Sequence, residues 1–442
     1  PLLAANAISD ATGEPYFLDH LILKRHGVKI AILGFTNPNM KNWLSYSLWS
    51  GMRFESLLPL VQEDVDRVIE KEHPHIVIVA VHAGTGKGDG LMLENQGMDL
   101  FKTLRGVDFL VCAHDHRPFT AANDSICLIN SGSHCRYVGH GTVSIEIRDG
   151  KCVSKSLDAG LIPVDRSKAD TAMRDRFRAD YEAVRAFTLR PVGQLKDALV
   201  TREAYAGMCG YVNLLHRISL DVPEAQLSFA APLTFNGRIE PGTLVYNDLF
   251  TIYPFENQLY VVKMTGKEIK DYLEYSYSTW INTVSGRGDE HLLMIRNEPD
   301  PRTGQRRWSF VGRSYNFDSA GGLIYDVDIT RPAGERIVIR SLADGSPFNP
   351  EAWYNVAMTS YRASGGGGIM REGAGIDTDS IDERIVARYP EVRELLYDYL
   401  KIHGSIDPAE TGDRSVIGEW HFIPAGLSER LMSRDMNLLF GH

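Results

Sequence analysis

Short apolar runs that alternate with helical patterns constrain the fold of the N-terminal part of this chain. Between residue 28 and about residue 150, the runs VKIAILGF, HIVIVAVHAG and FLVCAHDH are separated by amphipathic segments such as LLPLVQEDVDRVIEKEH. A strand covered on both faces is a continuous apolar run, and strands separated by such helices favour a layered α/β domain. Two later strands, SICLINSG and GTVSIEIRDG, follow each other without a helix, so the sheet is predicted to be mixed.

The length of 442 residues exceeds what one ordinary core organises, which predicts two domains. The segment from about residue 164 to 190 has Met173, Phe177, Tyr181 and Val184 at helical spacing and charged residues elsewhere. It is predicted to form a long, solvated connector helix that ends near Pro191. The expected division is therefore a first domain over 1–162, a connector over 163–190 and a second domain over 191–442.

Charge and cysteine content exclude several classes of protein. The net charge of −10 and the pI near 5.8 argue against a surface that coats a nucleic-acid polymer. No apolar segment approaches the roughly 20 residues that span a bilayer. The five cysteines are an odd number without zinc-knuckle or CxxC spacing, which predicts buried thiols rather than a disulfide scaffold.

Three histidines follow apolar strands and are candidate metal ligands. His82 ends the run HIVIVAVH, and His114 and His116 flank Asp115 directly after FLVCA. Ligands gather at the carboxyl ends of strands in open α/β sheets, and imidazole suits Zn, Mn, Fe or Co. Asp115 is placed to orient one of the rings. The alternative is that each histidine merely ends a strand in solvent. For one histidine alone that is the simpler interpretation, whereas the three together favour a metal site.

The order of further motifs resembles a known enzyme family. The stretches AANAISDATGEPYF, HGVKIAILGFTNP, VAVHAG, CAHDH and AGLIPVDR resemble the second half of the calcineurin-like metallophosphoesterase domain of 5'-nucleotidases and 2',3'-cyclic-nucleotide phosphodiesterases. SFAAPLTFNGRIEPGTLVYNDLFTIYPFENQLYVVKMTGKEI, YNFDSAGGLIYDVDITRPAGERI and YNVAMTSYRASGGGG resemble their nucleotide-binding domain. The resemblance implies a layered αββα metallophosphoesterase domain, present in part, joined by a long helix to an α/β 5'-nucleotidase C-terminal domain.

The resemblance also implies two divalent metal ions, Zn, Mn or similar. His82 matches the histidine of the family's GH or HxG loop, and His114 and His116 match its GHxH loop, with Ala113 where glycine is usual. The family's Asp-x-His, Gly-Asp and Gly-Asn-His motifs are expected upstream of residue 1, together with the catalytic residues. The chain then holds three of about seven ligands and is expected to be part of a longer protein or to associate with its own N-terminal fragment.

In the second domain the resemblance implies a nucleotide substrate site. It places Phe255 and Tyr361 on either side of the base, Asn257 at the base edge, and the backbone of Gly365 and Gly366 close to the ligand. Every base has a π-face that such rings can stack on. Core packing is the alternative role for both aromatic residues.

Weaker candidates stand beside these residues. Arg238, in FNGRIEPG, lies where relatives have an arginine-bearing loop, but a solvated turn arginine is an equal alternative. Asn236 and Asp318 are further candidates, whereas His134 and His140 are interpreted as structural.

The expected function is metal-dependent hydrolysis of 2',3'-cyclic nucleotides and 3'- or 5'-nucleotides to nucleosides and phosphate. The YNFD and YRASGGGG stretches favour the cyclic phosphodiesterase and 3'-nucleotidase branch without separating it from the 5'-nucleotidases. The resemblance implies export to the periplasm or cell surface. Two alternatives stay open: a nucleotide-binding module without catalysis, and a structural or adhesive surface protein that keeps the fold.

Overall fold

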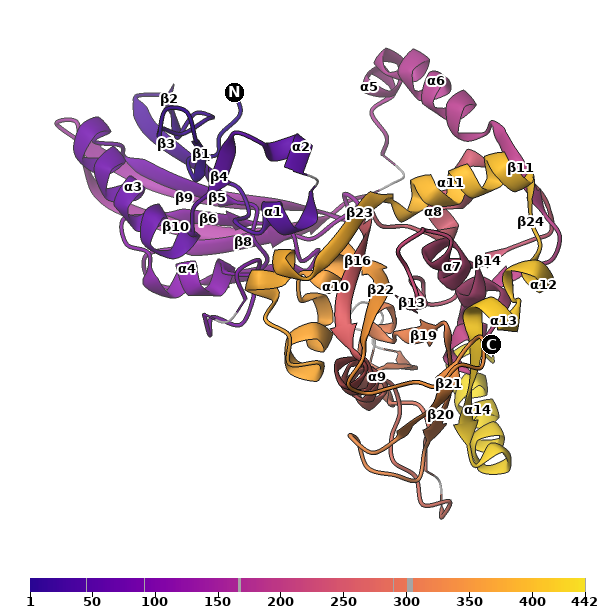
Figure 1. Cartoon of the computed structure of the whole chain (residues 1–442). Helices are drawn as coiled ribbons and strands as arrows, with labels where there is room; N and C mark the ends of the chain where they lie inside the picture. The colour runs from indigo at the N-terminus through magenta and orange to yellow at the C-terminus, as the bar shows by residue number, and fades with distance from the viewer. Residues whose placement is uncertain (45, 91, 166–167, 289, 300–304, 442) are drawn as a thin grey trace. The chain divides into compact units, whose positions relative to one another are not determined.

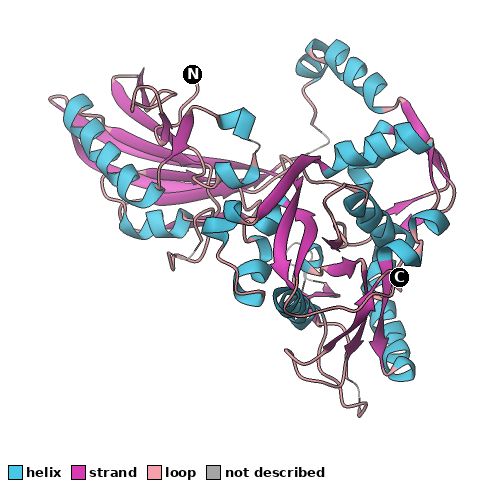
Figure 2. Cartoon of the chain, in the orientation of Figure 1, coloured by secondary structure: helices cyan, strands magenta, loops and turns pink. Residues whose placement is uncertain are grey.

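The computed structural model consists of two compact units, Pro1–Arg174 and Asp175–His442 (Figure 1). It describes residues 1–44, 46–90, 92–165, 168–288, 290–299 and 305–441. Helices and strands are interleaved along the chain in both units, so the protein is of the mixed α/β class (Figure 2). Over these described ranges, no helix combines the length and the apolar character needed to cross a membrane.

The first unit contains ten strands and four complete helices within the described residues. The strands are β1 (Ala7–Ser9), β2 (His20–Arg25), β3 (Val28–Phe35), β4 (Met52–Phe54), β5 (Ile76–Val81), β6 (Phe109–Cys112), β7 (Pro118–Ala122), β8 (Cys127–Ser131), β9 (Tyr137–Arg148) and β10 (Lys151–Pro163). The helices are α1 (Met40–Trp43), α2 (Tyr46–Trp49), α3 (Leu57–Glu72) and α4 (Gly97–Thr103).

A six-stranded mixed sheet organises this unit. Its strand order is β2-β3-β5-β6-β8-β7. The four central strands are parallel, and β2 and β7 add antiparallel edges. The mixed sheet predicted from the sequence is confirmed. The apolar runs form strands because both faces of the sheet are covered, which suits continuous β-branched segments.

Helices cover one face of the sheet and a long hairpin covers the other. Helix α3 turns Leu57, Val61, Val65 and Val68 inward at helical spacing, and they join the sheet's main core. On the opposite face a smaller cluster built on Phe109, Cys127 and Ile129 packs against side chains of β9 and β10. The carboxyl ends of the parallel strands remain at one edge of this layered sandwich.

The second unit has fifteen strands and nine complete α-helices within the described residues. The strands are β11 (Pro191–Leu195), β12 (Leu199–Val200), β13 (Leu227–Ala230), β14 (Arg238–Ile239), β15 (Gly242–Val245), β16 (Gln258–Thr265), β17 (Ile295–Pro299), β18 (Arg306–Phe310), β19 (Ser319–Gly321), β20 (Leu323–Asp328), β21 (Ile337–Leu342), β22 (Trp353–Thr359), β23 (Ile385–Glu391), β24 (Ser405–Ile406) and β25 (Gly418–Ile423). The helices are α6 (Arg178–Thr188), α7 (Gly210–Leu220), α8 (Tyr246–Ile252), α9 (Gly266–Trp280), α10 (Ser360–Ala363), α11 (Val392–His403), α12 (Pro408–Thr411), α13 (Arg414–Ile417) and α14 (Ala425–Phe440).

A five-stranded sheet, β19-β13-β22-β16-β23, separates two hydrophobic cores in this unit. Alternate residues of β16 face opposite sides of the sheet. Leu259 and Val261 join one core, and Val262 and Met264 join the other. A three-stranded sheet, β21-β20-β25, adds Tyr325, Trp420 and Phe422 to the larger core.

The predicted connector differs from the structure. Residues up to Pro163 belong to β10, because its pairing with β9 continues to the Pro163–Tyr137 pair. Among the described residues of this segment, helix begins at Thr171, where α5 (Thr171–Arg176) starts, and Phe177, with φ −100° and ψ 9°, separates α5 from α6. In the described part of 163–190, the expected long helix is therefore replaced by the two shorter helices α5 and α6.

The cysteine prediction is confirmed in part. All five thiols are free. Cys112 and Cys127 are buried, as expected, but Cys135 and Cys152 are exposed, so the prediction of buried thiols is wrong for these two.

Candidate functional site

Parallel pairing of two strands brings His82 and His114 together. Strands β5 and β6 run parallel with Ala80 opposite Val111, so the loops that follow them leave the sheet side by side. His82 directly follows β5, and His114 lies two residues beyond β6. Their imidazole ring centroids are 5.3 Å apart with the rings inclined at 67°. The structure thus places these two candidate ligands next to each other.

Asp115 joins the loops of this strand edge. Its carboxylate accepts the backbone N–H of Thr85 at 2.8 Å and the Asn130 side-chain amide, also at 2.8 Å. Asn130 also donates to the Thr85 hydroxyl at 3.1 Å, which completes a network between the ends of β5, β6 and β8. These hydrogen bonds fix the backbone that carries the histidines, and the expected orientation of a histidine ring by Asp115 stays a prediction.

Glu94 is a neighbour of His114 that the sequence did not reveal. Its carboxylate lies 3.7 Å from Nε2 of His114. The fully buried Asn37 donates to the backbone carbonyls of both His82, at 2.9 Å, and Glu94, at 3.1 Å. The side-chain amide of Asn37 therefore fixes the spacing between His82 and the segment that carries Glu94. Glu94 lies in the loop before α4 without a hydrophobic period or motif around it, so no sequence signal marked it.

Left-handed backbone geometry is concentrated in these loops. His114 has φ 73°, His116 has φ 56° and His134 has φ 58°. Such values are uncommon outside glycine, and they cluster at functional sites where the surrounding structure imposes them. Ala113 does not have a positive φ, so the backbone at this position does not require glycine. The ring of His134, which the sequence analysis set aside as structural, lies 6.3 Å from that of His116.

The histidines influence one another electrostatically. Partial burial, followed by the positive charges that His114 and His116 carry when protonated, lowers the pKa of His82 below its usual value. A lowered pKa keeps the imidazole of His82 neutral at physiological pH. The neutral ring is the form that binds metal ions.

The donor chemistry of this cluster suits a transition metal. His82, His114 and Glu94 offer two imidazoles and a carboxylate, a set typical of Zn and Mn sites. Throughout the described part of the chain, no group of three or more histidine, cysteine, aspartate or glutamate side chains is arranged to hold a metal ion. The residues fit a metal in ligand type, and the metal assignment, including His116, stays a prediction.

The second unit gathers three aromatic rings at a loop edge. Phe255, in the loop before β16, is 38% exposed. Its ring centroid lies 5.9 Å from that of Tyr315, which in turn lies 6.5 Å from that of Tyr361. Both contacts are edge-on, at 72° and 76°. The two predicted aromatic residues thus have Tyr315 as a common neighbour, and the sequence had offered only the YNFD stretch as a sign of it.

A buried ion pair holds this aromatic group in place. Arg362 donates to both carboxylate oxygens of Asp318 at 2.8 and 2.7 Å, and each residue is 3% exposed. Arg362 also donates to the backbone carbonyl of Tyr315 at 3.0 Å and to that of Gly366 at 2.5 Å. Burial is the largest single influence and would lower the pKa of Arg362, but the charge of Asp318, together with the nearby Tyr272 and Tyr361 and the hydrogen bonds to Asp318, raises this pKa above its usual value. The guanidinium of Arg362 therefore links the segment that contains Tyr315 to the glycine loop, residues 365–368.

The glycine loop needs residues without a side chain. Gly365 and Gly367 have φ of 95° and 75°. A Cβ atom at Gly366 would lie 2.5 Å from the ring of Tyr361. At Gly367 it would lie 2.6 Å from Nη1 of Arg362. These glycines allow the loop to pack directly on Tyr361 and Arg362.

Asn257 and Arg238, two further predicted substrate residues, make hydrogen bonds within the protein. Asn257 donates to the hydroxyl of Tyr253 at 3.5 Å, and its carbonyl accepts the N–H of Val392 at 3.0 Å. Arg238 forms a two-pronged ion pair with Glu240, at 2.7 and 3.0 Å, on an exposed strand. These contacts agree with the alternative that Arg238 is a solvated arginine in a turn. A role of Arg238 in substrate binding stays a prediction.

Part of the second unit matches a known domain family. Residues 191–372 match the family model of the 5'-nucleotidase C-terminal domain. Over 94% of its length the chain is 22% identical to the trifunctional nucleotide phosphoesterase protein YfkN of Bacillus subtilis, of which it spans 31%. Over 98% of its length it is 24% identical to a 2',3'-cyclic-nucleotide 2'-phosphodiesterase/3'-nucleotidase of Haemophilus influenzae, of which it spans 71%.

Solved structures show the same fold. A Staphylococcus aureus protein assigned to the 5'-nucleotidases superposes with a TM-score of 0.71 at 18% identity, covering 96% of this chain and 78% of that one. A 5'-nucleotidase precursor from Thermus thermophilus gives a TM-score of 0.54 at 19% identity, with the same coverage of both chains. Residues 191–372 therefore match the 5'-nucleotidase C-terminal domain, and the chain is similar over most of its length to proteins named as a trifunctional nucleotide phosphoesterase and a 2',3'-cyclic-nucleotide 2'-phosphodiesterase/3'-nucleotidase.

Proposed function

We propose that the protein hydrolyses nucleotide phosphoesters, namely 2',3'-cyclic nucleotides and 3'- or 5'-nucleotides, to nucleosides and phosphate. One observation carries the proposal: the chain joins a 5'-nucleotidase C-terminal domain to a unit in which two parallel strands end in adjacent histidines. Relatives named as nucleotidases and phosphodiesterases support this class of reaction. Because the chain spans only 31% of the first of these relatives, the activity is proposed for the whole protein.

In the first unit, His82, His114 and His116 would hold two divalent metal ions together with ligands supplied from upstream of residue 1. When bound, such ions supply Lewis-acid chemistry, which neutralises phosphate charge and activates water for in-line attack. Asp115 and Asn130 would keep the histidine loops in position. The neutral imidazole of His82, favoured by its lowered pKa, would be ready to bind metal without first losing a proton.

In the second unit, Phe255 and Tyr361 would bind the base between their rings. Tyr315, which contacts both rings edge-on, would brace them and limit the space for the base. Arg362 and Asp318 are too deeply buried to serve as surface ligands, so they would position the aromatic residues. The backbone of Gly365 and Gly366 would pass close to the ligand.

A nucleotide-binding module without catalysis is the second candidate. It is favoured by the incomplete metal-ligand group within the described residues, alongside an aromatic cluster that has its supporting contacts in place. We propose export to the periplasm or cell surface, in line with the relative that is named a precursor.

A substrate ranking tests the proposal. The protein expressed from its complete reading frame would be assayed on 5'-AMP, 3'-AMP and 2',3'-cyclic AMP with Mn or Zn present. We expect release of phosphate or opening of the cyclic ester, with the fastest substrate naming the branch. Binding of adenosine without turnover of any of the three esters would favour the binding module instead.

A further inference from the structure

A fourth histidine lies at the strand ends that carry the three candidate metal ligands. His134 follows β8, which pairs in parallel with β6, so its loop leaves the sheet beside the loop of His114 and His116. The ring centroids of His134 and His116 are 6.3 Å apart, and the rings are inclined at 75°. The parallel pairing that brings His82 to His114 thus also brings His134 to His116.

Close backbone packing fixes the segment that carries His134. Gly132 has φ 73°, its N–H donates to Oδ1 of Asn130 at 3.0 Å, and an added Cβ atom would lie 3.4 Å from the backbone oxygen of His116. Asn130 in turn donates to Asp115 in the loop after β6. The two loops are therefore tied together by their backbones, and the proximity of the two rings follows from that packing.

The serine before His134 contacts one of its ring nitrogens. Nδ1 of His134 lies 2.9 Å from the hydroxyl of Ser133. When this hydroxyl donates to Nδ1, the proton of the neutral imidazole lies on Nε2, which is then a hydrogen-bond donor. His134 is exposed, so a ligand can reach this donor. Its left-handed backbone, with φ 58°, is of the strained kind that clusters at functional sites.

The position of His134 suits contact with a substrate better than metal ligation. The strand order β5-β6-β8 places it on the opposite side of β6 from the strand that carries His82. Zinc sites use three or four protein ligands, and within the residues that the structure describes no such group of histidine, cysteine, aspartate or glutamate is arranged around His134. A phosphoryl oxygen, by contrast, needs only one N–H donor, and its negative charge strengthens that hydrogen bond.

We propose that His134 is a substrate-binding residue that donates its Nε2–H to a phosphoryl oxygen of the ester. The proposal rests on the proposed function, because a phosphoester held at His82, His114 and His116 is what brings that oxygen to these strand ends. His134 recognises the phosphoryl group, whichever nucleoside carries it.

Replacing His134 by asparagine tests this contact. Asparagine tolerates the left-handed backbone, but its side chain is shorter and lacks the imidazole Nε2–H. Titration calorimetry with inorganic phosphate on the full-length protein loaded with Mn measures binding without any turnover. We expect phosphate to bind about tenfold more weakly to His134→Asn, and metal analysis to give an unchanged metal content.

His140→Gln is the matched control. His140 belongs to the strand that follows the His134 loop, where it lies opposite Gly160 of β10 and away from the candidate metal ligands in the pairing of β9 with β10. Its phosphate affinity and metal content should equal those of the unmodified protein.

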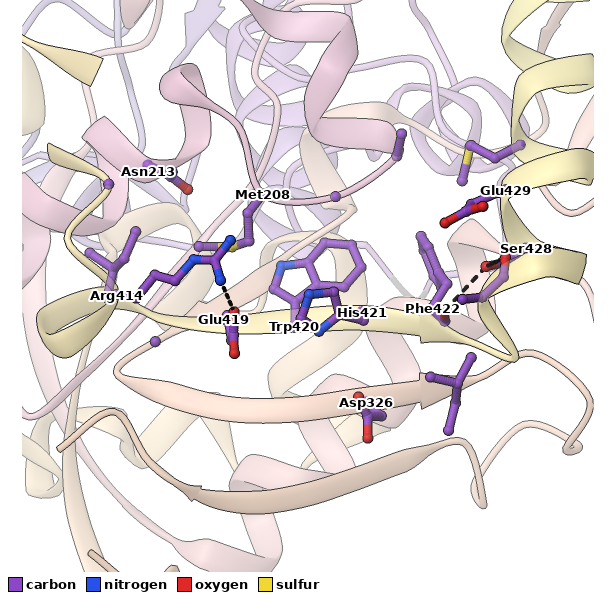
Figure 3. Close-up of a pocket in the computed structure, with 18 of the residues that line it drawn as sticks. Met208, Asn213, Asp326, Arg414, Glu419, Trp420, His421, Phe422, Ser428 and Glu429 are labelled. Atoms are coloured by element: carbon purple, nitrogen blue, oxygen red, sulfur yellow. Dashed lines mark hydrogen bonds and ion pairs between the residues drawn. The ribbon is translucent and has the colours of Figure 1, made fainter. Parts of the chain in front are cut away.

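A cavity of about 820 to 1,000 Å³ in the second unit is another place where phosphate could bind in this titration, and it needs its own control. Figure 3 shows Arg414 in its wall beside Glu419, and the two side chains form an ion pair at 2.6 Å. Because Glu419 already engages this guanidinium, Arg414→Gln should leave phosphate affinity unchanged.

Weaker phosphate binding in His134→Asn, with both controls unchanged, supports the proposal even in a protein that hydrolyses no ester. In that case the proposed function alone fails. The proposal is overturned if the unmodified protein binds no phosphate, or if folded His134→Asn binds phosphate as tightly as the unmodified protein. A loss of metal in His134→Asn also overturns it, because His134 would then be a metal ligand.

Discussion

His114 combines a left-handed backbone with a side chain directed at two potential partners. Its ring faces that of His82, and its Nε2 lies near Glu94. Glycine or asparagine adopts a φ of 73° at lower cost than histidine, so the backbone conformation alone gives no reason for a histidine at this position. The strained conformation is therefore best explained by the ring position that it provides.

Replacing His114 by asparagine tests its role as a ligand. Asparagine tolerates the left-handed backbone but loses the imidazole, so we expect lower metal content and a loss of activity by roughly 100-fold on all phosphoesters alike. Metal analysis and assays on nucleotide and aryl phosphate esters would measure it. His26→Asn, at an exposed left-handed histidine, is the control. An unchanged metal content in His114→Asn would remove His114 from the ligands.

Replacing Phe255 or Tyr361 by alanine tests base stacking. Because stacking contributes about 1–3 kcal/mol per base, KM for nucleotides should rise roughly 5- to 150-fold while KM for an aryl phosphate changes little. Steady-state kinetics on both substrates would measure the difference. Tyr181→Ala, at a tyrosine that is 64% exposed on α6, is the control. Equal losses on both substrates would contradict the assignment.

At the residue scale, the strand-end rule predicted the proximity of His82 and His114, because parallel strands bring their carboxyl ends to one edge. Glu94 and Arg362 were not predictable in this way. Glu94 reaches His114 through a loop held by Asn37, and Arg362 acts through contacts with residues 44 to 47 positions earlier. Such contacts depend on tertiary packing, which leaves no local pattern.

The glycine loop between α10 and the next helical turn is an element whose shape depends on missing side chains. In Gly367→Ala, the new Cβ would overlap Arg362 and Asn316 in addition to straining the backbone. We expect a loss of stability of about 1–3 kcal/mol and nucleoside affinity that is lower by roughly tenfold. Gly345→Ala is the matched control, because φ there is 83° but no atom lies within 4 Å of the added Cβ.

Thermal melting and adenosine titration of both glycine variants separate strain from overlap. The control carries backbone strain alone, so it should lose stability and keep nucleoside affinity. Equal affinity in Gly367→Ala and Gly345→Ala would show that the loop's contact with Arg362 does not shape the nucleoside site.

His216 makes the second unit sensitive to acid. This fully buried residue of α7 contacts the hydroxyls of Ser228 at 2.9 Å and Ser319 at 3.1 Å, which links α7 to β13 and β19. Burial lowers the pKa of His216 to about 3. The unfolded chain takes up a proton near pH 6.5, and the folded chain does so only near pH 3. The stability that the neutral His216 contributes is therefore fully present above pH 6.5 and declines as the pH falls toward 3.

Replacing His216 by glutamine should flatten this decline. The change removes up to about 1.4 kcal/mol of stability loss per pH unit within that window. Urea denaturation of the second unit's transition at pH 7, 6, 5 and 4 would measure the slope. His403→Gln, at an exposed histidine, should keep the original slope. Parallel slopes in the unmodified and His216→Gln proteins would contradict a neutral, buried His216.

Elements were predictable where hydrophobic periodicity is strong. The runs VKIAILGF and QLYVVKMT form β3 and β16 at those residues. The predicted start of the connector was wrong, because β10 pairs with β9 up to Pro163 and α5 begins at Thr171. The charged stretch after residue 285 contributes the fully buried Leu292 and Leu293 to the larger core. Adjacent charges concealed that apolar pair.

At the scale of the whole molecule, each unit has its own cores and carries its own part of the proposed chemistry. His82 and His114, at the ends of β5 and β6, belong to the first unit, and the aromatic group of Phe255, Tyr315 and Tyr361 belongs to the second. Because the two groups of residues lie in separate units, variants of the first unit should alter turnover, and variants of the second unit should alter recognition of the base.

The proposed activity depends on a divalent metal held at His82, His114 and His116. The most direct measurement is the metal content of the full-length protein, with turnover of 2',3'-cyclic AMP, 3'-AMP and 5'-AMP recorded before chelation, after chelation and after metal is restored. We expect bound Zn, Mn or a similar ion, turnover that is lost on chelation, and turnover that is regained when metal is restored. A protein that binds adenosine but contains no metal and hydrolyses none of these esters would contradict it.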